Sequence, residues 1–391
     1  GGGDAAAGAS ATAGRTFREV ALTEPIRYAP GDAVEKWLND LLCLDCTTTP
    51  YRLSGGCPHP RDTELYVVDR DALFSYHKVS EVFLQRLMTL YVSSHYKNSP
   101  NDLQLMSDAP AHRVFALLGP VKPDAPPGTL PDILCVIQVA LEGQLASESM
   151  KAALARGQTS SGDLIPWTMS QQFQDTEFAA LSGARIVRIA THPDVTHMGY
   201  GTRAVELLTR YFQGEFVPLG GGAGSGSDDS DAEDGEGAAG AGASGADAGA
   251  GLLKEKLKPR KKLPPLLVNL ADRKPPRLHW LGTSFGVTLN LFKFWHKAAF
   301  LPVYVRQTAN EITAEHTCIM VKSLKCDDLP DAPAEGWLAG FTTDFARRFV
   351  ALLAVAFREM DTTLASSIVM SANGLAKPGG KTAAAAAAGG A

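Results

Sequence analysis

The chain has 391 residues, 45% of them hydrophobic, and a formal net charge of −5 at pH 7. This is enough apolar material to bury one sizeable core with appendages. The chain is therefore not basic overall. Because the net charge averages an acidic stretch and a basic cluster, it does not exclude a nucleic-acid partner. No apolar run approaches the ~20 residues of a membrane-spanning helix, no signal peptide is visible, and the six cysteines are scattered. We therefore expect a soluble, intracellular, reduced protein with no membrane partner.

The first half of the chain begins with an Ala- and Gly-rich stretch, residues 1–14, that we expect to be disordered. Apolar residues then recur at helical spacing over residues 71–94, and Ser99 followed by Pro100 suits a helix N-cap and first helical position. The predicted elements are a short helix at 37–46, a strand at 64–68, a long helix at 71–94, a short helix after residue 99, and strands at 113–118 and 133–141.

The second half contains a long stretch, residues 220–251, made almost only of Gly, Ala, Ser, Asp and Glu. This composition buries too little apolar surface to offset its ordering entropy, so we expect a disordered insertion. A basic run follows at residues 254–262 and is either a solvated tether or an RNA contact. The predicted elements around the insertion are a strand at 185–191, a helix at 202–213, a strand at 278–284, a helix at 289–298, strands at 301–306 and 316–323, and an amphipathic helix at 337–358.

A glycine loop between a strand and a helix is the most informative motif. The strand Arg185-Ile-Val-Arg-Ile-Ala-Thr191 leads into the loop Thr196-His-Met-Gly-Tyr-Gly-Thr202, where an apolar helix begins. Glycine allows the backbone to approach a phosphate closely, and the first N–H groups of the helix point at the anion. The spacing matches neither a nucleoside-triphosphate loop nor a dinucleotide fingerprint. The motif predicts an anion site, with a plain strand-to-helix turn as the alternative.

The loop resembles the acyl-CoA pyrophosphate loop of the GCN5-related acetyltransferases, with Thr196 where Gln or Arg is usual. Six further segments in order resemble the RNA cytidine acetyltransferases, nucleolar eukaryotic enzymes related to the bacterial tRNA(Met) cytidine acetyltransferase. These segments are His95-Tyr-Lys-Asn-Ser-Pro-Asn-Asp-Leu103, Ser161-Gly-Asp-Leu-Ile-Pro-Trp167, Gln172-Phe-Gln-Asp-Thr-Glu-Phe178, Leu281-Gly-Thr-Ser-Phe-Gly286, Phe294-Trp-His-Lys-Ala-Ala-Phe-Leu-Pro-Val-Tyr304 and Glu315-His-Thr-Cys-Ile-Met320.

The resemblance implies an α/β fold, that of the GCN5-related N-acetyltransferases, with a mixed central sheet flanked by helices, a disordered insertion and a C-terminal helical extension. Relatives carry an ATP-driven helicase-like module before the acetyltransferase part. No Gly-x-x-x-x-Gly-Lys-Ser/Thr occurs here, so we expect a fragment of a longer protein, with ATP bound only through the absent module. The implied domains are a disordered stretch at 1–14, a junction or trailing edge of the helicase-like module at 15–60, the acetyltransferase domain at 61–325, a helical extension at 326–362 and a disordered tail at 363–391.

The implied reaction transfers acetyl from acetyl-CoA to the exocyclic N4 amine of cytidine in rRNA and tRNA, by direct attack on the thioester. Because the lone pair of that amine is delocalised into the ring, catalysis needs close positioning, a base and donors for the oxyanion. Lys297 stands where relatives often have Arg and would supply a point charge rather than a fork. By resemblance, the residues that hold acetyl-CoA are Ile189, Ala190, Thr191, Thr196, His197, Met198, Gly199, Tyr200, Gly201, Thr202 and Lys297.

Two neighbouring residues are expected to be catalytic. His95 ends the long first helix, which borders the acceptor site in this fold, and a neutral imidazole suits proton removal. The alternative for His95 is a histidine stabilised by a helix C-terminus. Tyr96 is a second candidate, for hydrogen bonding or base stacking. His192 beside the cofactor strand is a further candidate base, for which we prefer a role in the turn before Pro193.

No metal site is expected. Cys43, Cys46, Cys57 and His59 could suggest zinc by spacing, but the first two lie in an apolar helical run where thiols pack as small hydrophobes. The implied partners are rRNA, tRNA and RNA-guiding adaptor proteins in the nucleus and nucleolus, and Trp167 is either an RNA contact or core. A protein lysine acetyltransferase and a non-catalytic ribosome-assembly scaffold are the alternative functions.

Overall fold

The computed structural model describes residues 18, 20, 25–46, 51–94, 98–121, 129–157, 162–216, 264–325, 329 and 332–374. These residues fall into two units, Gly1–Asp45 and Cys46–Ala391. The disorder expected at 1–14 and 220–251 lies outside the described residues, as does the basic run at 254–262.

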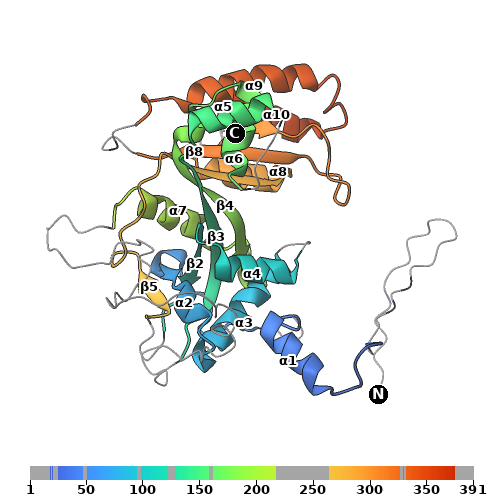
Figure 1. The fold of residues 1–391 in the computed structure, drawn as a ribbon, viewed down its shortest axis with the longest axis vertical. Helices are drawn as coiled ribbons and strands as arrows, with labels where there is room; N and C mark the ends of the chain where they lie inside the picture. The colour runs from blue at the N-terminus through green and yellow to red at the C-terminus, as the bar shows by residue number, and fades with distance from the viewer. Residues whose placement is uncertain are drawn as a thin grey trace, which may run out of the picture. The chain divides into compact units, whose positions relative to one another are not determined.

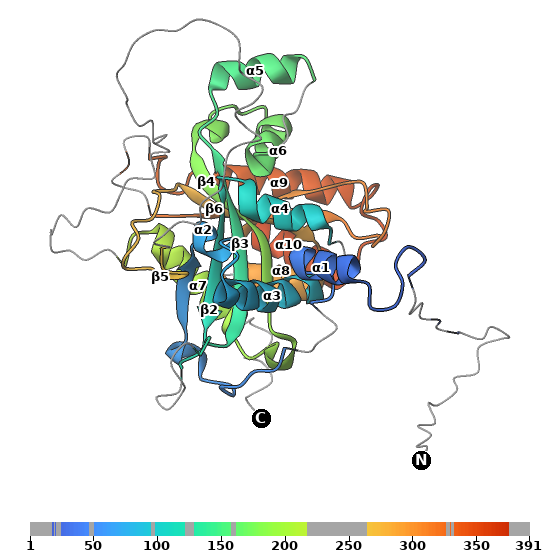
Figure 2. The ribbon, with the colours of Figure 1, turned by 60° about the horizontal axis from the view of Figure 1, so that its bottom comes forward.

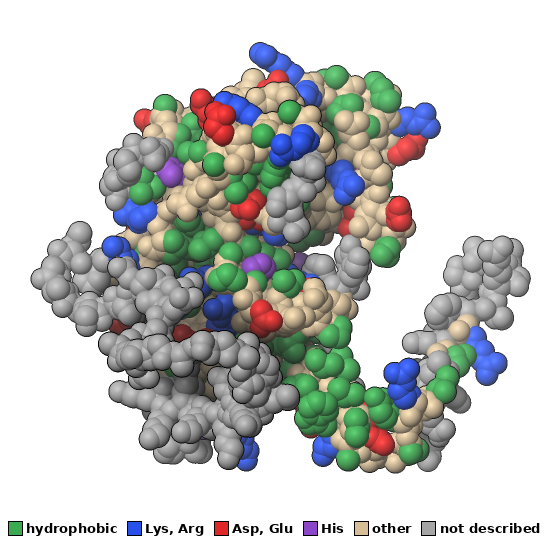
Figure 3. Space-filling model, in the orientation of Figure 1, with side chains coloured by type: hydrophobic (Ala, Val, Ile, Leu, Met, Phe, Trp, Pro, Cys, Tyr) green, Lys and Arg blue, Asp and Glu red, His purple; other side chains and the backbone are tan. Residues whose placement is uncertain are grey.

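The described helix of the first unit is α1 (Ala33–Leu42). It begins after Asp32, whose Oδ1 accepts the N–H of Val34 at 2.7 Å, as an N-cap residue does. Val34 and Trp37 are more than half exposed, and Figure 3 shows hydrophobic side chains gathered over this helix. The first unit therefore contains an amphipathic helix whose apolar side chains are accessible.

An eight-stranded mixed sheet organises the second unit (Figure 1). The strand order is β5-β1-β2-β3-β4-β6-β8-β7, and every neighbouring pair is antiparallel except β4 and β6, which are parallel. The strands are β1 (Glu64–Val68), β2 (His112–Leu118), β3 (Ile133–Gly143), β4 (Ser182–Thr191), β5 (Leu267–Asn269), β6 (Trp280–Gly286), β7 (Leu301–Val305) and β8 (Thr317–Ser323).

Helices cover both faces of this sheet, as Figure 2 shows for the face where α3 and α4 cross the strands. Ile137 of β3 packs into the core that includes α7, so its neighbour Gln138 faces the other way. Arg188 pairs with Gln138 and reaches α3 and α4 on that second face. The helices are α2 (Arg70–Leu73), α3 (Lys78–Ser93), α4 (Pro100–Asp108), α5 (Ser147–Ala155), α6 (Leu164–Phe173), α7 (Tyr200–Phe212), α8 (Leu289–Lys297), α9 (Leu338–Leu352) and α10 (Thr362–Ala372).

A buried ion pair fixes α6 on the same face as α3 and α4. Glu142 lies four residues after Gln138 on β3, so both side chains share a face. Its Oε1 accepts from Nε of Arg185 at 2.5 Å, and its Oε2 accepts the N–H of Ile165 at 3.0 Å. The carboxylate thereby joins β3, β4 and the first turn of α6, where a negative charge is favourable.

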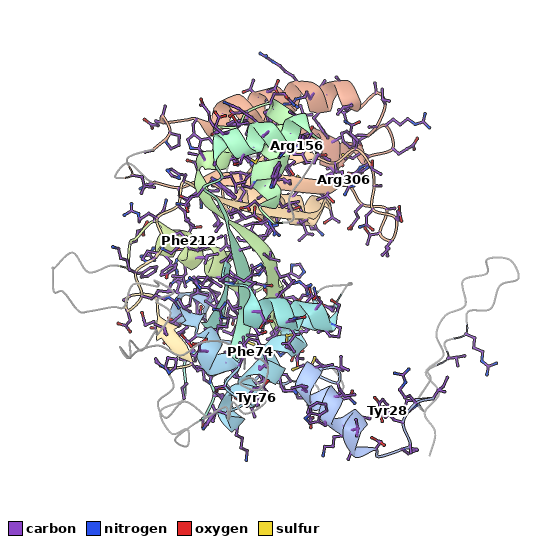
Figure 4. The ribbon with its side chains drawn as sticks, viewed as in Figure 1. Tyr28, Phe74, Tyr76, Arg156, Phe212 and Arg306 are labelled. Atoms are coloured by element: carbon purple, nitrogen blue, oxygen red, sulfur yellow. The ribbon has the colours of Figure 1, made fainter. Side chains whose placement is uncertain are left out.

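The α/β fold with a mixed central sheet is confirmed, and most predicted strands and helices are present. The prediction of one long helix at 71–94 is wrong, because this segment forms two helices, α2 and α3. The chain turns between them at Phe74 and Tyr76, both labelled in Figure 4, and Tyr76 is left-handed with φ 58°. The expected second helix is confirmed: it begins at Pro100, and the N–H of Ser99 donates to Asp102 Oδ2 at 2.9 Å.

Four elements were not predicted from the sequence: β5, α5, α6 and α10. Strand β5 has only three residues, and α6 carries Pro166 in its first turn, where proline is tolerated because that N–H needs no helical partner. Helix α10 lies where we expected a disordered tail from residue 363, so that expectation is wrong as far as residue 374. The segment is rich in Ser and Thr, which have weak helix propensity, and it folds because Ile368 and Ala372 enter the main core.

Replacing Ile368 with alanine is expected to lower the free energy of unfolding by about 2 to 5 kcal/mol, because the side chain is fully buried and its loss leaves a cavity. Urea or thermal unfolding would measure the change. Met370→Ala on the same helix is the control, since Met370 is 45% exposed; equal losses in the two variants would contradict the packing of α10.

Candidate functional site

The central feature of the site is the divergence of β4 from β6. The two strands pair over only four positions, from Gly183 with Trp280 to Ile186 with Thr283. Both strands then continue, β4 to Thr191 and β6 to Gly286. Beyond Ile186, the β4 edge that faces β6 is therefore unpaired among the described strands, and its main-chain groups can bind a ligand inserted between the strands.

A bulge marks the point where the strands part. Gln138 pairs with Arg188 and Val139 with Ile186, so Val187 is the extra residue of β4. A bulge bends its strand and re-aims the following side chains. The predicted strand contacts lie just past it: Ile189 and Thr191 are half-buried and Ala190 is buried. The prediction of a strand leading into the glycine loop is confirmed in position.

The glycine loop has two residues in the left-handed region, separated by Met198. His197 has φ 62° and Gly199 has φ 94°, and Thr196, His197, Met198 and Gly199 are exposed. Left-handed backbone is common only for glycine and costs other residues free energy, so this loop has a specified shape. The Thr196 hydroxyl donates to Pro193 O at 3.2 Å. Thr196 therefore stabilises the preceding turn rather than extending into the loop, where Gln or Arg would reach in relatives.

Helix α7 begins directly after the loop with an open N-terminus. Its N-cap is Gly199, and no side chain caps its first turn. The N–H groups of Tyr200, Gly201 and Thr202 thus lie at the positive end of the helix dipole, where an anion is stabilised.

Gly201 lies where the start of α7 packs closely on its neighbours. A Cβ at this position would lie 3.3 Å from Thr191 Oγ1, tighter than an ordinary contact, and 3.6 Å from a ring carbon of Phe294. Glycine therefore allows the start of α7 to approach the end of β4 and α8 closely. Lys297 is exposed on α8 three residues after Phe294, hence on the same side of that helix. Together these groups suit a pyrophosphate-bearing ligand between β4 and β6.

The predicted catalytic residues His95 and Tyr96 lie outside the described residues, but their flanks are held against β4. Arg188 Nη1 donates to Asn98 Oδ1 at 2.6 Å, and its Nη2 lies 2.9 Å from Asp102 Oδ1. The same guanidinium lies 4.4 Å above the ring of Tyr91. One residue after the bulge, Arg188 therefore joins the end of α3 and the start of α4 to β4. An arginine inside an apolar strand was the sequence signal for this contact, and we missed it.

His192 has a structural role, in agreement with our preferred interpretation. Its ring is buried, with Nε2 2.8 Å from the carbonyl O of Tyr51, and its Nδ1 accepts the N–H of Asp194 at 3.2 Å. An Nδ1 that accepts requires the proton on Nε2, so both ring nitrogens of the neutral imidazole are used. This leaves no free nitrogen on His192 to act as a base.

Beside the end of β4 lies a cavity of about 690 Å³. Its walls are residues 51–53, 56 and 57, the last turns of α3 at Thr89 and Ser93, and the turn at His192 and Asp194. The cavity is thus bordered by the helix whose end leads to His95 and by the turn that leads into the glycine loop.

The described residues contain neither a metal-binding cluster nor a membrane-spanning helix. No group of three or more His, Cys, Asp or Glu side chains there could hold a metal ion. Among the same residues, every helix is too short or too polar to cross a bilayer. Trp167, considered as an RNA contact or core, is half-buried on α6.

Family models match three parts of the chain. The model "GNAT acetyltransferase 2" matches residues 86–325, which include β2 to β8 and the glycine loop. The model "RNA cytidine acetyltransferase NAT10/TcmA, helicase domain" matches residues 7–45, and "Possible tRNA binding domain" matches residues 337–387. The first match supports the N-acetyltransferase fold that the resemblance implied.

Curated relatives agree with these matches. The chain is 63% identical to an RNA cytidine acetyltransferase of Achlya ambisexualis, over 89% of this chain and 91% of that protein. It is 53% identical to the human RNA cytidine acetyltransferase over 93% of this chain, and 51% identical to that of Saccharomyces cerevisiae over 91%. The chain spans only about a third of the length of these last two relatives, 34% and 33%.

Solved structures are far more distant. Arabidopsis thaliana NAA60 in complex with a bisubstrate analogue is 6% identical and has a TM-score of 0.34, with 68% of this chain and 99% of that chain covered. The likeness is too weak to carry an argument about the site.

The variant Gly201→Glu is expected to weaken acetyl-CoA binding at least about tenfold, a loss of more than about 1.4 kcal/mol. A carboxylate at the start of α7 would fill the space beside Thr191 and compete with the pyrophosphate for the helix N-terminus. Calorimetric titration would measure the affinity.

Gly340→Glu on α9 is the matched control, because nothing lies within 4 Å of a Cβ there. Undiminished affinity in a folded Gly201→Glu protein would contradict the assignment of the loop.

Proposed function

The chain belongs to the RNA cytidine acetyltransferase family, and from this membership we propose that it transfers acetyl from acetyl-CoA to the N4 amine of cytidine in rRNA and tRNA. The product would be N4-acetylcytidine. The observation that carries the proposal is the end of the β4–β6 pairing at Ile186, which leaves the rest of β4 unpaired on that edge near an uncapped helix N-terminus, in a chain 53% identical to the human relative.

The cofactor contacts in this proposal are mostly main-chain groups. The N–H groups of Tyr200, Gly201 and Thr202 would bind the pyrophosphate, and Lys297 would add a cation nearby. The unpaired edge of β4 at Ile189 and Thr191 would hydrogen-bond the pantetheine arm and orient the thioester carbonyl. Bound acetyl-CoA would supply an acetyl group attached to a thiolate that leaves readily. The protein would hold the thioester in position for attack.

The acceptor side needs positioning and a base. We assign the base to His95 and a hydrogen-bonding or stacking role to Tyr96, which follow the end of α3. As the N4 nitrogen forms its bond to the thioester carbon, N4 loses a proton to His95, the C–S bond breaks, and the CoA sulfur takes up a proton. Arg188 supports this assignment because it contacts Tyr91 before the segment, and Asn98 and Asp102 after it, beside the bulge.

Direct attack without an acyl-enzyme is part of the proposal. Burial raises the pKa of the Cys135 thiol to about 12, and burial likewise raises the pKa of Cys318. A thiol kept protonated is a poor nucleophile, so neither cysteine is suited to accept the acetyl group. Cys135 instead accepts a weak hydrogen bond from the Thr191 hydroxyl at 3.7 Å.

Further properties are proposed from family membership alone. They are a nuclear and nucleolar location, adaptor proteins that guide the choice of RNA, and ATP binding by a helicase-like module outside this chain. The match of residues 337–387 to a tRNA-binding model supports an RNA contact at α9 and α10.

His95→Ala is expected to lower turnover about 100-fold or more, as loss of a general base does, with acetyl-CoA affinity retained. An RNA acetylation assay that detects N4-acetylcytidine would measure it, with a lysine peptide as the competing acceptor. His77→Ala, at the opposite end of α3, is the control. Unchanged turnover would remove His95 from the mechanism, and transfer to the peptide alone would favour the lysine acetyltransferase.

Arg188→Ala is expected to reduce turnover by about tenfold to hundredfold, because the acceptor segment loses its tie to β4 and small displacements are costly. Steady-state kinetics with saturating acetyl-CoA would show the loss. Arg210→Ala removes an ion pair of similar length, 2.8 Å to Glu215, at the far end of α7 and should leave turnover unchanged. Equal effects of the two variants would argue against a positioning role.

A further inference from the structure

Residues 51–62, which we name the clasp segment, lie against the glycine loop. The acetyltransferase model covers residues 86–325 and the helicase model residues 7–45, so neither includes this segment. The described structure nevertheless connects it to both ends of the loop.

Asp132 anchors the clasp segment at the start of β3. This carboxylate is only 7% exposed. It accepts the N–H of Ser54 at 2.7 Å, the N–H of Gly55 at 2.5 Å and the hydroxyl of Tyr51 at 3.1 Å. Hydrogen bonds to an ionised group are roughly twice as strong as neutral ones, so the anchor is firm. β3 starts beside the end of β4, since Cys135 pairs with Thr191.

Tyr51 connects this anchor to the turn before the loop. Its hydroxyl donates to Asp132 and accepts the N–H of Ile133 at 3.0 Å. Its carbonyl accepts from His192 Nε2 at 2.8 Å, and the two rings meet edge to face at 5.2 Å. His192 in turn accepts the N–H of Asp194, so the turn that leads into Thr196 is fixed by a continuous chain of hydrogen bonds.

Tyr200 connects the clasp segment to the other end of the loop. It is the first residue of α7, its side chain is 1% exposed, and its hydroxyl donates to Pro58 O at 2.5 Å. Pro60 lies 3.6 Å from where a Cβ of Gly199 would be. Both ends of the loop, at His192 and at Tyr200, are therefore held by the same segment.

We propose that the clasp segment holds the glycine loop in its anion-binding shape, and that Tyr51 and Tyr200 are positioning residues for acetyl-CoA. The ligand in this inference rests on the proposed function; the restraint of the loop does not. Because His197 lies in the left-handed region, the free loop can reach other backbone conformations of lower strain. If the clasp segment holds the loop in its anion-binding shape, the loop loses less conformational entropy when the ligand binds.

Tyr200→Phe and Tyr51→Phe test the proposal, because each removes one hydroxyl and little volume. Each is expected to raise the KM and the dissociation constant for acetyl-CoA about threefold to tenfold, the effect of one or so hydrogen bonds, with kcat at saturation unchanged. Tyr66→Phe is the control: it removes a hydroxyl bonded to Glu64 at 2.6 Å on β1. An unchanged KM in both clasp variants, or a fall confined to kcat, would overturn the proposal.

Hydrogen exchange in the ligand-free 391-residue chain separates this inference from the proposed function. Amides of residues 192–203 should exchange faster in Tyr200→Phe and Tyr51→Phe than in the wild type or Tyr66→Phe, because the loop opens more often. A lowered melting temperature with unchanged exchange in this loop would show a merely structural role and overturn the proposal. Faster exchange in a chain whose wild type binds no acetyl-CoA would support the clasp and refute the cofactor.

Discussion

The four-residue pairing of β4 with β6 is the constraint on which the rest of the site depends. If β4 and β6 paired over more positions, the β4 edge beyond Ile186 would be hydrogen-bonded to β6 and could not bind a ligand. If they paired over fewer, the two halves of the sheet would be poorly joined. The bulge at Val187 sets the end point, because the extra residue turns β4 away from its register. The glycine loop and α7 then follow from the direction in which β4 leaves the sheet.

Charged side chains on β3 and β4 also hold the helices on one face of the sheet. On the sheet face opposite α7, Arg188 joins α3 and α4 to β4, and Glu142 with Arg185 joins α6 to β3 and β4. Two arginines of one strand thus hold helices on either side of the point where β4 leaves β6. The two arginines are half-buried, and a charged group taken out of water is favourable only when its partners are in place, so these contacts fix the helices more than they add net stability.

The sequence predicted what depends on neighbouring residues. The strand before the loop, the glycine turn, the cap at Ser99 with Pro100, and most strands depend on local pattern, and the structure contains them. What it did not predict depends on distant contacts. Tyr51 meets His192 across 141 residues and Pro58 meets Tyr200 across 142, and no periodicity signals such pairs. Helix α10 was missed for the same reason, since core packing outweighs its Ser and Thr content.

The boundary of the acetyltransferase unit follows from these distant contacts. The matching family model begins at residue 86, inside α3 and after β1. The compact unit that contains the sheet nevertheless begins at Cys46. A chain cut at residue 86 would lose β1 from the sheet, the hydrogen bonds of Tyr51 and Pro58, and the donors that Tyr51 and Ser54 give to Asp132. Since these contacts join the segment before β1 to β3 and to α7, that segment belongs to the fold that shapes the glycine loop rather than to a linker.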